Sequence, residues 1–505
     1  MIPAKTTDPI SPTHVTRTGN LDRSLAAGIA WTTGAKWSCQ LISSASVVIV
    51  TRLLMPSDFG LVGMAGLYFG LLLVVTDAIG KAVTTLRDLT GEQLAQLNTV
   101  ALMSGFLACL ISCGLAIPLG HFFRSPRLPL VVVVMSTTFL VSALRTVPYS
   151  LLYRDMRFRL LSILDAIQMI VQALAMVAFA WLGFGYWTLV LGSIVGTATL
   201  AGLQLSMRPC RFAWPRFSEI DNALTFSRHM MVSNLSWYGF TNADFLVAGR
   251  MLGQAALGAY TLAWTLATFP LEKITANVSS VCYSYFSACQ HDNTALRRYL
   301  RVLTEGLSII TFPATIGLAL VASDFVPLVF GAKWQSTILP LEILAFYGCL
   351  RCVVTLLPSI LNVTGESHFV MRMMQVALIL MPTAFYVGSR WGPGGIAYGW
   401  VVAYPVIAMC IYRRTFRKIK MPWYDYLGAI RPALTGCLVM AAAVEILKHT
   451  LAPSFPLSVR FGIEALAGGG AYALTLTVFH RDRLSVFWNF VKALRDPVRV
   501  NTVVE

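Results

Sequence analysis

Four basic residues lie inside long apolar stretches of this 505-residue chain, where a charge is costly to bury: Lys36, Arg145, Lys273 and Arg351. Arg145 and Arg351 occur in similar contexts, Leu-Arg-Thr-Val and Leu-Arg-Cys-Val. Basic side chains held away from bulk water can bind phosphate or carboxylate, and arginine does so with two parallel hydrogen bonds. The four residues therefore predict a cationic cavity wall that binds an anionic ligand.

Three acidic residues at comparable depth leave a structural alternative open: Asp77, Asp165 and Asp244. Each could hold a basic residue in a fixed ion pair and have no part in binding. Glu272, beside Lys273, makes this alternative strongest for that lysine. Asp244 precedes a mainly apolar stretch and is the best candidate to bind a coupling proton or cation.

Membrane-crossing helices must position these residues. Hydrophobic residues make up 56% of the chain and charged residues only 12%, and windows of about 20 apolar residues recur along it. In lipid a spanning segment satisfies its own backbone hydrogen bonds as a helix, and these runs do not alternate as barrel strands do. We predict an all-α polytopic membrane protein with about fourteen helices, over 29–51, 59–79, 98–118, 129–151, 161–182, 187–206, 230–250, 257–285, 303–322, 338–360, 371–388, 394–412, 428–447 and 458–479.

The basic residues predict the orientation of these helices. With both termini placed in the cytoplasm, 27 of the 39 Lys and Arg residues fall in or beside inner segments, and 8 fall in outer connections. This excess is the positive-inside pattern, and it accounts for most of the net charge of +16 without a nucleic-acid partner. The stretch 81–97 is expected to form an amphipathic helix on the inner surface.

Tryptophans divide into two groups by position. Trp31 and Trp37 share the polar first helix with Lys36 and could stack on a sugar, with packing as the alternative. Others near the ends of predicted helices are expected to anchor them at the membrane interface: Trp187, Trp391, Trp400, Trp423 and Trp488.

The chain repeats part of itself. The segment Arg52-Leu-Leu-Met-Pro-Ser-Asp-Phe-Gly60-Leu-Val-Gly-Met-Ala65 matches Arg250-Met-Leu-Gly-Gln-Ala-Ala-Leu-Gly258-Ala-Tyr-Thr-Leu-Ala263 at an offset of 198 residues. The Arg145 and Arg351 contexts match at 206, so we expect the second half to have gained residues within 323–337. Six predicted helices separate the copies, and both halves enter the membrane in the same direction. This arrangement predicts two pseudo-symmetric six-helix lobes around a central cavity, as in alternating-access transporters.

Signals of catalysis or of a resident cofactor are missing from the sequence. The chain contains no phosphate-binding loop motif, no His-Glu-x-x-His and no Gly-x-Ser-x-Gly. Cys349 and Cys352 have C-x-x-C spacing, but packing within a helix is the favoured interpretation. We expect no enzymatic activity, no cofactor and no metal.

Several segments resemble a known family. Gly34-Ala-Lys-Trp37 with the Arg52–Ala65 segment, Tyr153-Arg-Asp-Met-Arg-Phe158 and Asn242-Ala-Asp-Phe-Leu-Val-Ala-Gly-Arg250 are similar to segments of bacterial polysaccharide flippases. The nearest group is the colanic-acid-exporter (WzxC-like) branch of the MOP superfamily. The resemblance implies a flippase in the bacterial inner membrane. Its cargo would be an oligosaccharide repeat unit linked to undecaprenyl pyrophosphate, for exopolysaccharide, capsule or lipopolysaccharide synthesis. Polysaccharide polymerase and chain-length proteins are possible partners.

Two other functions remain open. A cation-coupled multidrug exporter of the same superfamily would favour acidic cavity residues, and the deep charges here are mainly basic. A membrane glycosyltransferase or polymerase would need a large outer loop or a catalytic acid pair in a loop, and neither is found in the sequence.

The predicted organisation follows from these boundaries. It consists of a cytoplasmic tail (1–24), an N-lobe (25–206), a cytoplasmic linker (207–228), a C-lobe (229–412), a basic cytoplasmic linker (413–427), two further helices (428–479) and a cytoplasmic tail (480–505).

Overall fold

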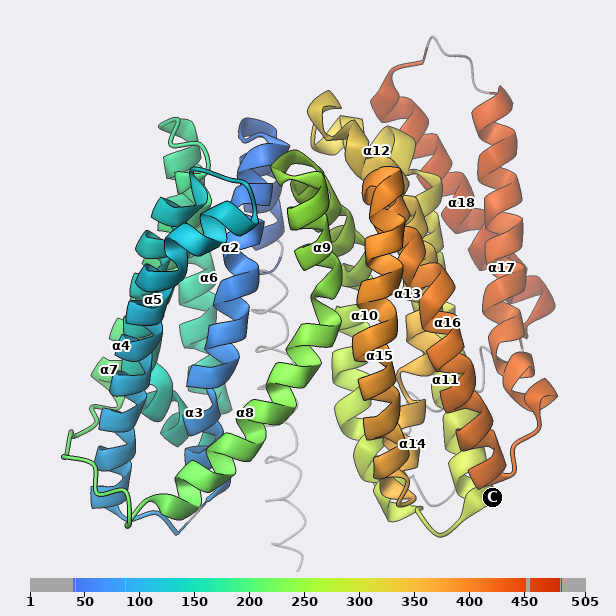
Figure 1. Ribbon diagram of the computed structural model, residues 1–505. Helices are drawn as coiled ribbons and strands as arrows, with labels where there is room; N and C mark the ends of the chain where they lie inside the picture. The colour runs from blue at the N-terminus through green and yellow to red at the C-terminus, as the bar shows by residue number, and fades with distance from the viewer. Residues whose placement is uncertain (1–39, 41, 87, 451–454, 482, 484–505) are drawn as a thin grey trace, which may run out of the picture. The chain divides into compact units, whose positions relative to one another are not determined.

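The computed structural model of the chain describes residues 40, 42–86, 88–450, 455–481 and 483. Within these residues every regular element is a helix, which confirms the predicted all-α fold (Figure 1). Ten helical stretches of the described residues are long and apolar enough to cross a membrane. Each predicted span from 59–79 onward overlaps a helix. Of the first span, 29–51, the part from residue 42 onward is helical, and 29–39 and 41 lie outside the described residues. The number fourteen stays a prediction.

The chain divides into two compact units, which share α4, α5 and α8 between them. The first unit comprises 1–53, 76–111 and 134–230, and the second comprises 54–75, 112–133 and 231–505. The described helices of the first unit are one over Ile42–Leu53, α3 (Ala78–Thr85), most of α4 (Gly91–Phe122) and of α5 (Leu128–Arg154), α6 (Phe158–Trp181), α7 (Trp187–Met207) and the start of α8 (Asp221–Thr241). The predicted lobe boundaries remain predictions.

The second unit holds the larger set of helices. They are α2 (Pro56–Thr76), α9 (Ala243–Leu252), α10 (Gln254–Ala288), α11 (Asn293–Leu320), α12 (Ala322–Val329), η1 (Ala332–Thr337), α13 (Ile338–Val354), α14 (Leu357–Val363), α15 (Ser367–Gly388), η2 (Ser389–Trp391), α16 (Gly392–Ile419), α17 (Trp423–Thr450) and α18 (Leu457–Phe479).

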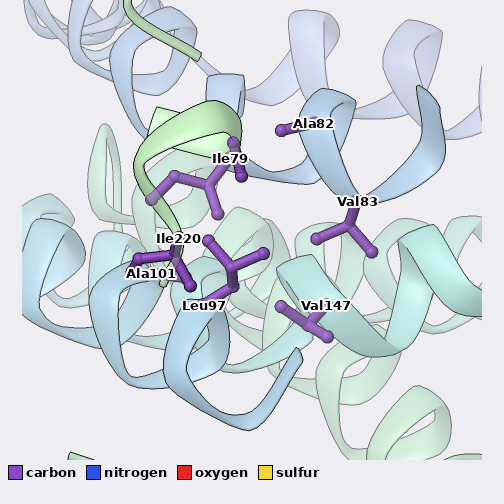
Figure 2. Packing of buried hydrophobic residues seen from close by; sticks show 8 residues of the cluster. Ile79, Ala82, Val83, Leu97, Ala101, Val147 and Ile220 are labelled. Atoms are coloured by element: carbon purple, nitrogen blue, oxygen red, sulfur yellow. The ribbon is translucent and has the colours of Figure 1, made fainter. Parts of the chain in front are cut away.

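A small apolar core fixes α3 in the first unit. Figure 2 shows Ile79, Ala82 and Val83 of α3 packed with residues of α4, α5 and the segment before α8. The segment between α7 and α8 is held along α4 by polar contacts. Gln96 Nε2 donates to Glu219 Oε2 at 2.8 Å, and this bond lowers the pKa of that exposed carboxyl below its usual value. Close packing and these hydrogen bonds together fix the position of α3 against α4 and α5.

The predicted amphipathic helix over 81–97 is wrong. The chain leaves the helical conformation after Thr85 and starts a new helix at Gly91. Thr90 and Gln93 explain the new start, because each side chain caps the backbone of the other. Gln93 Oε1 accepts from Thr90 N at 2.9 Å, and Thr90 Oγ1 accepts from Gln93 N at 3.2 Å. This reciprocal capping satisfies backbone groups at the beginning of α4.

In the second unit, the beginnings of α2 and α10 cross in close contact at Gly60 and Gly258, the two glycines of the sequence repeat. A Cβ on Gly60 would overlap the carbonyl oxygen of Gln254, and a Cβ on Gly258 would overlap that of Pro56. Pro56 and Gln254 are themselves equivalent positions, 198 residues apart. The same contact is therefore made in both directions, as a twofold relation between the segments requires.

Further contacts of the second unit surround this crossing. The side chain of Gln254 donates to Ser125 Oγ at 2.6 Å, and Phe59 packs edge-on against the fully buried ring of Trp334, with centroids 5.3 Å apart. Trp334 belongs to η1, which lies with most of α12 in the segment 323–337. That the second half gained residues there stays a prediction.

The last two helices, α17 and α18, pack against α13 and α11 of the second unit. Tyr426 of α17 donates to the carbonyl oxygen of Val353 at 2.6 Å, and Tyr472 of α18 donates to that of Ile309 at 2.7 Å. Hydrogen bonds are strong where water is excluded, so these two hold α17 to α13 and α18 to α11.

The glycine crossing can be tested by adding one methyl group. Gly60→Ala is expected to destabilise the protein by about 1–3 kcal/mol, because its Cβ needs the space of the Gln254 backbone. The measurement is the thermal unfolding of purified protein in detergent. Gly66→Ala, on the same helix with no atom within 4 Å of the added Cβ, is the control and should retain wild-type stability. Equal melting temperatures for all three proteins would contradict the crossing.

Candidate functional site

A polar pocket of about 430 Å³ lies in the first unit, between α3, α5, α6 and α7. Its lining combines charged, hydroxyl and amide side chains, which is unusual for the interior of apolar helices. The lining residues are Asp77, Gly80, Lys81, Thr84, Arg145, Thr146, Tyr149, Ser150, Asp165, Gln168, Thr197 and Leu200. Three residues singled out from the sequence, Arg145, Asp77 and Asp165, are therefore brought together.

The charges of this pocket are balanced. Lys81 and Arg145 provide two positive charges, and Asp77 and Asp165 provide two negative ones. The pocket in this unit therefore has as many acidic as basic side chains, whereas the sequence predicted a cationic wall. Arg145 nevertheless retains a donor, since its Nε is buried without a hydrogen-bond partner among the described residues. A buried donor of this kind is suited to a ligand oxygen.

Two pocket residues that the sequence did not single out could have been found from helix spacing. Lys81 follows Asp77 by four residues, and Tyr149 follows Arg145 by four. Residues at this spacing on a helix lie on the same face, one turn apart. Asp77 and Arg145 were each identified alone, and a search one turn along from each would have added their neighbours.

Arg351 lies on α13 of the second unit and has different surroundings. Its half-buried side chain lies beside Tyr347 and Tyr404. No described carboxylate forms an ion pair with it. The structural alternative of a fixed acid partner is therefore not observed for Arg351. That Arg145 and Arg351 face one cavity stays a prediction.

The remaining basic and aromatic candidates are not placed by the structure. Lys36, Trp31 and Trp37 lie outside the described residues. Lys273 belongs to α10, and its side chain is outside the described part.

Asp244 is fully buried at the start of α9 and is held by two aromatic donors. Tyr260 Oη donates to Asp244 Oδ2 at 2.7 Å, and Trp400 Nε1 donates to the same oxygen at 3.0 Å. The other carboxyl oxygen, Oδ1, has no hydrogen-bond partner among the described residues. An acid with one satisfied and one open oxygen can accept a proton without losing its donors.

Trp400 corrects one expectation from the sequence. It was predicted to anchor at the membrane interface, but it is 2% exposed and packs within a group of aromatic rings. Its ring centroid lies 4.7 Å from that of Tyr347 and 5.0 Å from that of Phe385. Tyr347 and Arg351 are one turn apart on the same face of α13, so we group Asp244, Trp400, Tyr347 and Arg351 together. We refer to these four residues with Tyr260 as the Asp244 cluster.

The role of the Tyr260 hydroxyl can be measured. Tyr260→Phe removes one donor from a buried carboxyl and is expected to lower stability by about 1–3 kcal/mol. Thermal unfolding in detergent provides the measurement. Tyr398→Phe, at an exposed position of α16, is the matched control and should have no effect. If Tyr260→Phe is as stable as the control, the hydrogen bond to Asp244 does not contribute.

The sequence is similar to those of curated membrane-transport and polysaccharide-biosynthesis proteins. The chain is 24% identical over 466 residues to the "Succinoglycan biosynthesis transport protein ExoT" of Rhizobium meliloti (strain 1021), covering 90% of this chain and 92% of the relative. It is 24% identical over 418 residues to the "Lipopolysaccharide biosynthesis protein WzxC" of Escherichia coli (strain K12), covering 77% and 84%.

A solved structure described as "Lipid II flippase MurJ, inward closed conformation" superposes with a TM-score of 0.72 at 14% identity, over 90% of this chain and all of the other. This likeness confirms that the chain shares the helical fold of that structure. The family model described as "Polysaccharide biosynthesis protein" matches residues 49–339, more than half of the chain. The resemblance found in the sequence is thereby confirmed, and the chain belongs to this family of polysaccharide biosynthesis proteins.

Proposed function

We propose that this membrane protein is a flippase that moves oligosaccharide repeat units linked to undecaprenyl pyrophosphate. Transport would run from the cytoplasmic to the periplasmic leaflet of a bacterial inner membrane. The observation that carries the proposal is the polar pocket of the first unit, in which the buried Nε of Arg145 has no hydrogen-bond partner among the described residues. The names of the relatives support it, since one is described as a transport protein and a structural neighbour as a lipid flippase.

The pocket can bind an anion by exchanging partners. A pyrophosphate oxygen at Arg145 would compete with Asp77 and Asp165 for the positive charge, so binding would be reversible. Arginine favours this exchange, because its guanidinium forms parallel hydrogen bonds with phosphate oxygens. The hydroxyl and amide groups of Tyr149, Ser150 and Gln168 are suited to sugar hydroxyls.

Alternating access would involve movement at the contact between the two repeated segments. The crossing at Gly60 and Gly258 joins the ends of α2 and α10 that are predicted to lie on the outer side. Release of cargo to that side requires the two ends to separate. The reciprocal contact gives the protein a defined closed state at this end, from which a second state can be reached.

Asp244 is our candidate for coupling. A proton on its open oxygen would remove a negative charge from the Asp244 cluster and change the electrostatic field at Arg351. Cargo affinity and protonation would then be linked in both directions.

A second candidate function is the cation-coupled multidrug exporter. It is favoured by one observation, the presence of Asp77 and Asp165 in the pocket, which could bind a cationic drug. Loss of drug resistance in cells that lack this protein, with normal surface polymer, would favour this function over the flippase.

Location and partners follow from the flippase. We place the protein in the inner membrane with both termini in the cytoplasm, close to the polymerase and chain-length proteins that would use its product.

Complementation tests the proposal. A host without its own exopolysaccharide flippase receives wild type, Arg145→Ala or Arg351→Ala, and surface polymer is quantified. We expect wild type to restore polymer and each variant to produce at least about tenfold less, because removing one partner of a buried charged contact costs about 2–5 kcal/mol. Polymer restored equally by all three would exclude a cargo role for these arginines.

Arg372→Ala is the matched control, because Arg372 is exposed on α15. It should complement like wild type at equal expression. If wild type fails in the host that makes its own cognate repeat unit, with the protein correctly inserted, the flippase proposal is wrong.

A further inference from the structure

The junction between α16 and α17 contains a pocket that none of the roles above uses. Its volume is about 560 Å³, and its lining residues are Arg413, Phe416, Arg417, Lys420, Met421, Pro422 and Trp423. The lining therefore contains three basic side chains and no acidic one. Charge topology predicts that this end of α16 lies on the inner side of the membrane.

The basic residues near the end of α16 fall into two sets on different sides of the helix. Arg414 and Lys418 both form ion pairs with Glu366, with N–O distances of 2.7 and 3.6 Å, so one of their two charges is balanced. The hydrogen bond from Arg414 lowers the pKa of the Glu366 carboxyl, which keeps it charged. Arg413, Arg417 and Lys420 follow the spacing i, i+4, i+7 and line the pocket instead. No described carboxylate forms an ion pair with any of these three.

The backbone at Lys420 is held in a conformation that glycine normally adopts. Lys420 has φ 54° and ψ 41°, the left-handed region in which a side chain is unfavourable. The turn is fixed by hydrogen bonds from Met421 N to Phe416 O at 3.0 Å and from Arg297 Nη1 to Lys420 O at 3.3 Å. A lysine at a glycine-type position suggests that its side chain has a use.

Packed aromatic rings form the base of the pocket. Phe416 is buried, and its ring lies edge-on to Trp423 with centroids 4.6 Å apart. Tyr412 packs against both rings, at 5.5 and 5.7 Å. The three basic side chains are exposed and lie beside this packed aromatic base, where an anion can reach them from solvent.

We infer that Arg413, Arg417 and Lys420 form a binding site for a phosphate group at the α16–α17 junction, separate from the cargo pocket. Arginine and lysine together provide bidentate and point-charge contacts to phosphate oxygens. The phosphate can come from an anionic lipid headgroup or from a soluble phosphate.

Two probes test the site on the purified full-length chain, both in an Arg145→Ala background so that the proposed cargo pocket does not contribute. Calorimetric titration with inorganic pyrophosphate measures a soluble phosphate. Native mass spectrometry from nanodiscs of phosphatidylglycerol or phosphatidylcholine measures a lipid headgroup.

The test variant is Arg413→Gln/Arg417→Gln, and the matched control is Arg414→Gln/Lys418→Gln, which removes the same charge from the same helix. We expect at least about tenfold weaker binding in the test variant, because it loses two charge-assisted contacts to phosphate oxygens. The control should stay within about twofold of the background protein. Lys420→Gly keeps the left-handed turn and removes one charge, so it should weaken binding without loss of stability.

Each result decides the proposal. Pyrophosphate binding that depends on the test pair supports a phosphate site open to soluble ligands. Retention of phosphatidylglycerol alone, lost in the test variant, supports a site for a lipid headgroup. Binding that neither probe detects, or that the control pair weakens as much as the test pair, overturns the inference. Failure here leaves the flippase proposal intact, because complementation depends on Arg145 and Arg351.

Discussion

The second unit depends on a contact that contains no side chain. At the crossing of α2 and α10, Gly60 and Gly258 let backbone meet backbone. Any Cβ at either position would occupy the space of a carbonyl oxygen, so the helices could not approach as closely. The neighbouring contacts assume this approach, since the hydrogen bond from Gln254 to Ser125 and the packing of Phe59 on Trp334 both start from residues beside the crossing.

Charged groups within these helices are handled in two ways. In the first unit, acids and bases share one pocket in equal number, which keeps its interior neutral while leaving the Arg145 Nε open. In the second unit, a single acid is placed among aromatic rings and satisfied on one oxygen by Tyr260 and Trp400. Low-dielectric surroundings strengthen both arrangements and make them sensitive to the loss of one partner.

The sequence predicted most of the helices and part of the candidate site. Helices follow from length and hydropathy, because lipid leaves the backbone no other solution. The repeat was visible because Arg, Leu, Gly and Ala kept their places, and its glycines proved to touch. The break between α3 and α4 was missed, although Thr90 and Gln93 have capping spacing. Burial of Trp400 could not be read from its place in the chain, because interface anchors and core tryptophans both occur near helix ends.

The crossing at Gly60 and Gly258 has a consequence for the environment in which the protein works. The crossing is made of main-chain atoms, so it contains no group that titrates and no ion pair that salt can screen. Changes of pH or salt act on ion pairs such as that of Arg414 with Glu366, and they leave this main-chain contact unaffected. The packing of α2 against α10 at this point is therefore expected to be insensitive to acidity and ionic strength.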